Sequence, residues 1–69
     1  MTTLTISVPE IHCDHCKSSI EGALVPLTGV ASARVDIPAR TVTVEVEETM
    51  TNRARLVAAI EEQGYDVPA

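Results

Sequence analysis

Residues 11–16 read Ile-His-Cys-Asp-His-Cys and contain both cysteines and both histidines of this 69-residue chain. The hydrophobic pattern changes across this stretch. Before it, Leu4–Val8 alternates apolar and polar residues, which is typical of a β-strand with one buried face. After it, apolar residues recur at helical spacing. The stretch is therefore expected to be a loop between a strand and a helix, and it gathers the sulfur and imidazole groups of the chain.

The helix that follows is expected to run from about Asp14 to Val25. Asp14 is the expected N-cap, because its side chain can accept a hydrogen bond from a free backbone N–H of the first turn. Pro26 limits the helix, because the residue before a proline is pushed out of the α region. Five apolar residues share one face and are expected to be buried: Cys16, Ile20, Ala23, Leu24 and Leu27.

The remaining chain predicts two more strands, a second helix and a last short strand. Residues 30–37 and 41–46 alternate and are joined by a short turn, which indicates a hairpin. Thr51 or Asn52 is expected to cap a helix that runs to about Gln63. The expected inward residues of the two strands are Ala31, Ala33, Val35 and Ile37, then Val42, Val44 and Val46.

With a last strand over residues 65–67, the element order is βαββαβ. This order fits an α+β, ferredoxin-like sandwich with a four-stranded antiparallel sheet and two helices on one face. Residues 1–69 show no linker and no low-complexity tract, so a single domain is expected.

Composition and charge exclude several classes of function. The formal net charge of −5 argues against a nucleic-acid partner, which requires a basic surface. No apolar run approaches the ~20 residues of a membrane span, and no signal peptide pattern is present, so no membrane insertion and a cytoplasmic location are expected. Neither a catalytic triad nor a phosphate-binding loop is found, so the chain is not expected to be an enzyme. In a reducing compartment a Cys-x-x-Cys pair is more often a metal or redox site than a structural disulfide.

Cys13 and Cys16 lie where metal-binding thiolates are favoured. The expected helix start places both sulfurs near unpaired backbone N–H groups and the positive end of the helix dipole, which lowers cysteine pKa values. Two thiolates suit the soft ion Cu(I), whereas a structural zinc site needs four ligands. Lys17 can offset the negative charge of a bis-thiolate metal site. A two-ligand, accessible site also suits metal exchange with a partner thiolate.

Several motifs add a resemblance to a known family. Residues 9–16 align with a Gly-Met-x-Cys-x-x-Cys signature, and Gly29-Val30, Val35-Asp36 and Gly64-Tyr65 match later positions. The sequence thereby resembles the heavy-metal-associated domain family and, within it, the bacterial CopZ-like copper chaperones, over essentially the whole chain. It departs from the signature at two positions, Glu10 in place of Gly and Ile11 in place of Met.

The resemblance implies a metallochaperone of metal homeostasis that binds Cu(I) through Cys13 and Cys16. It implies delivery to the metal-binding domains of a P-type copper ATPase, or to a copper-responsive repressor, and it places Tyr65 in a loop close to the site. The family's Met is a buried loop residue rather than a ligand, and Ile11 can fill that role because its volume is similar. Glu10 adds a negative charge beside the loop.

The accessory residues leave alternatives open. His12 and His15 are each either solvated loop residues or auxiliary ligands, with the solvated reading favoured for both. Lys17 is either a surface lysine or the charge-balancing residue. Tyr65 is either an aromatic core residue or also a contact of the metal site. A metal-bridged homodimer is a further alternative.

Three other functions compete with the copper chaperone. The first is a carrier of Zn(II) or Hg(II) that recruits His12 or His15. The second is a regulatory metal-binding domain of a metal-transporting ATPase. The third is a thiol-disulfide oxidoreductase, which is disfavoured because the chain is too short for a thioredoxin fold and lacks an aromatic residue before the Cys-x-x-Cys motif.

Overall fold

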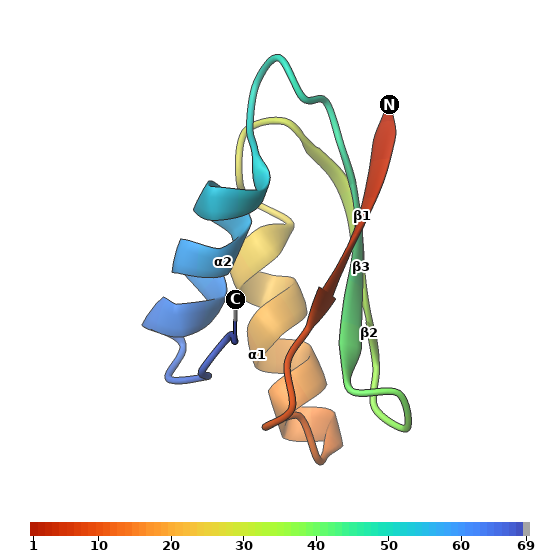
Figure 1. The fold of residues 1–69 in the computed structure, drawn as a ribbon, viewed down its shortest axis with the longest axis vertical. Helices are drawn as coiled ribbons and strands as arrows, with labels where there is room; N and C mark the ends of the chain where they lie inside the picture. The colour runs from red at the N-terminus through yellow and green to blue at the C-terminus, as the bar shows by residue number, and fades with distance from the viewer. Residues whose placement is uncertain (69) are drawn as a thin grey trace.

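Two helices cover one face of a three-stranded antiparallel sheet in the computed structural model, which describes residues 1–68 (Figure 1). The strand order is β1-β3-β2. This arrangement confirms the predicted α+β sandwich with both helices on one face. The elements are β1 (Thr2–Ser7), α1 (Asp14–Leu24), β2 (Val30–Asp36), β3 (Thr41–Val46) and α2 (Arg53–Glu62).

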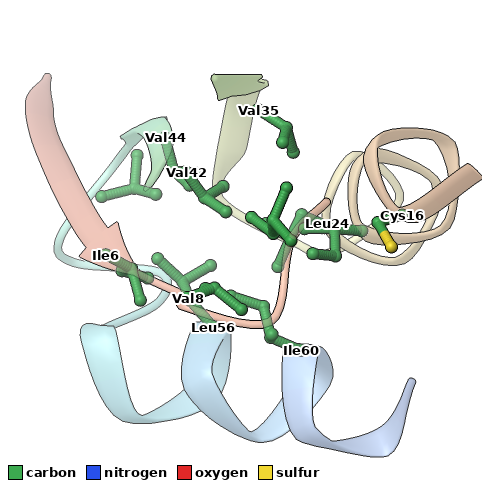
Figure 2. Packing of buried hydrophobic residues seen from close by; sticks show 12 residues of the cluster. Ile6, Val8, Cys16, Leu24, Val35, Val42, Val44, Leu56 and Ile60 are labelled. Carbon is green, nitrogen blue, oxygen red and sulfur yellow. The ribbon is translucent and has the colours of Figure 1, made fainter. Parts of the chain in front are cut away.

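The central strand β3 carries the core of the sheet. Its three valines have no exposed surface and face the helices, as their alternation predicts. β2 and β3 form the expected antiparallel hairpin, with Arg40 at a φ of 56° in the turn. Aliphatic side chains from every element meet in one cluster, and Cys16 lies at its edge (Figure 2). The labelled members in Figure 2 are Ile6, Val8, Cys16, Leu24, Val35, Val42, Val44, Leu56 and Ile60.

The predicted inward face of β2 is wrong at its start. Val30 pairs with Val46 and Ser32 pairs with Glu45, so Ala31 is an extra residue at a β-bulge. Ala31 is exposed, whereas Val30 packs against the core. A bulge changes which residues face inward, and beyond it Ala33 and Val35 point to the helices as predicted.

The predicted fourth strand over residues 65–67 is also wrong. Within residues 1–68 the chain after α2 makes no strand, and the sheet ends at β1. The backbone N–H of Asp66, which a fourth strand would use for pairing, is donated to the side chain of Glu10. Pro68 has no N–H to continue a ladder. The segment therefore finds its hydrogen bond at the loop before α1 instead of at a strand edge.

The two helices begin differently. The predicted N-cap Asp14 is the first helical residue, and the N-cap is Cys13, whose side chain makes no capping hydrogen bond. Asn52 caps α2 as predicted, with its side chain accepting the N–H of Arg55 at 3.0 Å. α1 ends at Leu24 and α2 at Glu62, each one residue before the expected end. Within residues 1–68, neither helix has the length and apolar character that a membrane crossing requires.

Candidate metal centre

The loop between β1 and α1 is held in place from the β2–β3 turn. The N–H of Val8 donates to the carbonyl of Arg40 at 2.9 Å, and the Arg40 guanidinium donates to the carbonyl of Pro9 at 3.3 Å. Ile11 then turns its side chain into the core, where it has no exposed surface. The prediction that Ile11 fills a buried loop position is therefore confirmed. In Figure 1 this loop lies at the end of the molecule where α1 begins.

The two sulfur atoms lie together at the start of α1. Cys13 Sγ and Cys16 Sγ are 3.6 Å apart. Two sulfurs at this separation can both lie ~2.3 Å from one ion, the usual length of a zinc–thiolate bond. Cys16 is only 2% exposed, whereas Cys13 is half-buried. The sulfur of Cys16 is thus buried at the edge of the core, and the sulfur of Cys13 is accessible.

His12 completes a group of three side chains. One of its ring nitrogens, Cys13 Sγ and Cys16 Sγ all lie within 4.8 Å of one another, and Nδ1 is 3.8 Å from Cys16 Sγ. The same Nδ1 lies 2.8 Å from the carbonyl oxygen of Glu10. Because a carbonyl only accepts, Nδ1 carries the proton in this pair. In this conformation His12 is therefore a hydrogen-bond donor beside the sulfurs, and Nδ1 has no free lone pair for a metal.

Tyr65 acts on the buried sulfur. Interaction with its hydroxyl is the main influence that lowers the pKa of Cys16 to about 7, and the His12 backbone and Cys13 also contribute. Burial opposes this shift, because it disfavours the charged thiolate. The same interaction raises the pKa of Tyr65. Tyr65 is half-buried and packs against the core that includes Cys16, and its role as a contact of the metal site stays a prediction.

The structure separates the two histidines that the sequence left equivalent. His15 is exposed and lies outside the group formed by His12 and the cysteines. Lys17 is half-buried, and its N–H donates to the carbonyl of Cys13 at 3.2 Å as part of the first helical turn. Its role as a charge-balancing residue stays a prediction.

Two contacts of the loop were not found from the sequence. They are the hydrogen bonds of Arg40 with Pro9 and of Glu10 with Asp66. Their partners lie 31 and 56 residues apart, and no spacing pattern connects such positions. The one available signal was the acidic residue at position 10, where the resembling signature has glycine.

Comparisons with known proteins identify a family and a shared fold. Residues 5–66 match the model of the heavy-metal-associated domain. The chain is 42% identical over 67 residues to the copper chaperone CopZ of Staphylococcus haemolyticus, covering 97% of this chain and 98% of that protein. The structure of a CopZ metallochaperone superposes with a TM-score of 0.94 at 36% identity, covering 97% of this chain and all of that one.

A domain of a larger transporter is also similar. It is the N-terminal domain of a potential copper-translocating P-type ATPase from Bacillus subtilis in the Cu(I)-loaded state, with a TM-score of 0.88 at 29% identity. The match covers 94% of this chain and 81% of that one. Residues 5–66 match the family model, and the sequence similarity to CopZ extends over nearly the full length of both chains. This chain therefore belongs to the heavy-metal-associated domain family.

Proposed function

We propose that this chain is a metallochaperone that carries Cu(I) as cargo on the thiolates of Cys13 and Cys16 and transfers it by ligand exchange. The observation that carries the proposal is the sulfur pair, 3.6 Å apart at the start of α1. Cys13 and Cys16 are the two cysteines of the chain, and a pair of thiolates suits a soft monovalent ion. The full-length similarity to a copper chaperone supports the same cargo.

The unequal burial of the two sulfurs suggests an order of exchange. Cys13 is half-buried and Cys16 is 2% exposed, so an incoming thiolate reaches the ion from the Cys13 side. The partner sulfur binds before Cys13 leaves, and Cys16 is released last. The pKa of Cys16 is lowered to about 7, so a larger share of this thiol than of an ordinary cysteine is thiolate near neutral pH and can accept the next ion.

The proposed recipient is the metal-binding domain of a P-type copper ATPase, located like the chaperone in the reducing cytoplasm. The similar ATPase domain has the same fold, so the two sites can meet as pseudo-symmetric surfaces. The net charge of −5 favours a recipient that presents positive charge. A copper-responsive repressor and a metal-bridged homodimer are further proposed partners. In each case the chain acts as a carrier and catalyses no reaction.

One observation favours a second cargo. His12 places an imidazole nitrogen within 4.8 Å of both sulfurs, and Zn(II) accepts mixed nitrogen and sulfur ligands. Zinc binding through Nδ1 would require His12 to give up its bond to the Glu10 carbonyl, or to turn so that Nε2 approaches. Cu(I), which needs only the two sulfurs, requires neither change and is the preferred cargo.

Competition with a chromophoric Cu(I) chelator tests the proposal. Reduced wild-type protein is expected to withdraw one Cu(I) from the chelator, and Cys13→Ser and Cys16→Ser are each expected to withdraw little. His15→Ala is the matched control, because His15 is exposed and outside the sulfur group, and it should retain wild-type affinity. Retained tight binding in both serine variants would overturn the assignment.

A further inference from the structure

The segment after α2 is fastened to the metal loop by one side chain. The N–H of Asp66 donates to a carboxylate oxygen of Glu10, although the two residues are 56 positions apart. A hydrogen bond to an ionised acceptor is roughly twice as strong as a neutral one. Glu10 directly precedes the buried Ile11, so the carboxylate is attached to a fixed point of the loop.

The segment after α2 makes few other backbone hydrogen bonds. The N–H groups of Gln63 and Gly64 return to carbonyls at the end of α2. Among residues 65–68, the backbone hydrogen bonds to other described residues consist of the Asp66–Glu10 bond. Tyr65 lies directly before Asp66 and packs half-buried against the core that contains Cys16. Whatever holds Asp66 therefore also holds Tyr65 against this core.

We propose that Glu10 is a positioning residue of the metal site: by binding the N–H of Asp66, it keeps Tyr65 against Cys16 and slows the release of the bound metal. Tyr65 packs half-buried against the core that contains Cys16, so a competing ligand has less access to this edge of the core while Tyr65 stays in place. The effect on metal release rests on the proposed function. The hydrogen bond and the position of Tyr65 are properties of the metal-free protein.

Amide hydrogen exchange in the metal-free, reduced protein tests the positioning step. Glu10→Ala is expected to speed the exchange of the Asp66 amide roughly tenfold, the loss that follows from removing a hydrogen bond to a charged group. Glu10→Gln keeps an acceptor oxygen and should recover part of the protection. Glu48→Ala removes the same charge from an exposed position between β3 and α2 and should leave Asp66 unchanged.

Release of Cu(I) to a chromophoric chelator tests the consequence. Glu10→Ala and Tyr65→Ala are each expected to release the ion on the order of tenfold faster, as removal of outer contacts of metal ligands commonly weakens a site. Because Glu10 is proposed to act through the Tyr65 side chain, the double variant should release Cu(I) no faster than Tyr65→Ala alone. Glu48→Ala should release it at the wild-type rate.

Three results would overturn the proposal: unchanged Asp66 exchange in Glu10→Ala, unchanged Cu(I) release in Glu10→Ala, or effects that multiply in the double variant. A wild-type protein that binds no Cu(I) would overturn both the proposed function and the role in release. Exchange at Asp66 in the metal-free protein tells the two failures apart, because it depends on Glu10 alone.

Discussion

The N-termini of the two helices are built for different purposes. α2 begins at Asn52, whose side chain accepts the N–H of Arg55 at 3.0 Å. α1 begins at Cys13, whose side chain makes no capping bond. Both N-caps have extended backbone, with φ of −145° and −156°, so the two starts differ in their side chains rather than in their geometry. The start of α2 is capped by the Asn52 side chain, whereas the start of α1, which carries the two cysteines, has no side-chain cap.

This difference shows that the start of α1 lacks the stability of a capping hydrogen bond at the place where the two cysteines lie. A capping side chain typically contributes ~1 kcal/mol. At Cys13 that contribution is missing, and the positive end of the helix dipole is left to stabilise thiolates. The structure compensates through the loop before α1, where Ile11 is buried and Arg40 and Asp66 hold its neighbours from distant parts of the chain.

The largest expected effect tests what the open helix start is for. Cys13→Ser and Cys16→Ser should each lower Cu(I) affinity by orders of magnitude, yet move stability in opposite directions. Serine is a preferred N-cap, so Cys13→Ser should raise the free energy of unfolding by roughly 0.5–1 kcal/mol. Cys16→Ser places a hydroxyl at a position that is 2% exposed and should lower it by about 1–3 kcal/mol.

Denaturant unfolding of the reduced, metal-free proteins, beside chelator competition, measures both effects. If Cys13→Ser were less stable than wild type, the α1 start would not be an open cap, and the comparison with α2 would fail.

The two glycines in the segments that follow the helices offer the next largest effect. Gly29, after α1, and Gly64, after α2, have φ of 90° and 93°. A Cβ at Gly29 would lie 2.8 Å from Met50 Cβ, whereas one at Gly64 would meet nothing within 4 Å. Gly29→Ala is therefore expected to cost about 3 kcal/mol, from backbone strain and overpacking, and Gly64→Ala about 1–2 kcal/mol, from strain alone. Thermal unfolding of both variants checks this, and equal losses would show that the approach of Met50 carries no cost.

A smaller effect is expected at the closed helix start. Asn52→Ala removes the cap of α2 and should cost about 1 kcal/mol, whereas Asn52→Ser replaces it with another good cap and should cost little. Cu(I) affinity should not change in either variant, because Asn52 begins the helix that carries no cysteine. Denaturant titration measures the stability. An Asn52→Ala variant as stable as wild type would remove the cap as the feature that distinguishes the two helices.

The smallest expected effect is a dependence on pH. The pKa of Cys16 is lowered to about 7 from an ordinary value of 9.0, so the folded protein binds its proton less tightly than the unfolded chain. The resulting stabilisation is present above the ordinary value and is lost as the pH falls through about 7. Thiolate absorbance of the reduced protein should show a titration near this pH. Tyr65→Phe should move that titration upward, and an unmoved midpoint would exclude Tyr65 as its main cause.

Local patterns predicted the parts of the fold whose neighbours are close in sequence. The alternating valines of β3, the hairpin with β2 and the Asn52 cap follow from residues within a few positions of one another. The bulge at Ala31 has no such signal, because Ala fits both faces of a strand. Residues 65–67 read as a strand, but pairing is a long-range choice, and the N–H of Asp66 goes to Glu10 instead.

The site shows the same limit. The spacing of Cys13 and Cys16 predicted that both sulfurs lie at the start of one helix, since three residues on a helix return to the same face. Their pattern gave no reason to separate His12 from His15, because both flank a cysteine. The direction of His12 depends on the carbonyl of Glu10, which only the folded loop provides.

X-ray absorption at the bound metal, after competition between Cu(I) and Zn(II) for the reduced protein, tests the central claim most directly. The account predicts that Cu(I) is bound in preference to Zn(II), with two or three sulfur neighbours and no nitrogen. Preferred binding of Zn(II) with imidazole nitrogen would contradict it and would place His12 or His15 among the ligands of a zinc carrier. Absence of tight metal binding would contradict it equally and would favour thiol redox chemistry at Cys13 and Cys16.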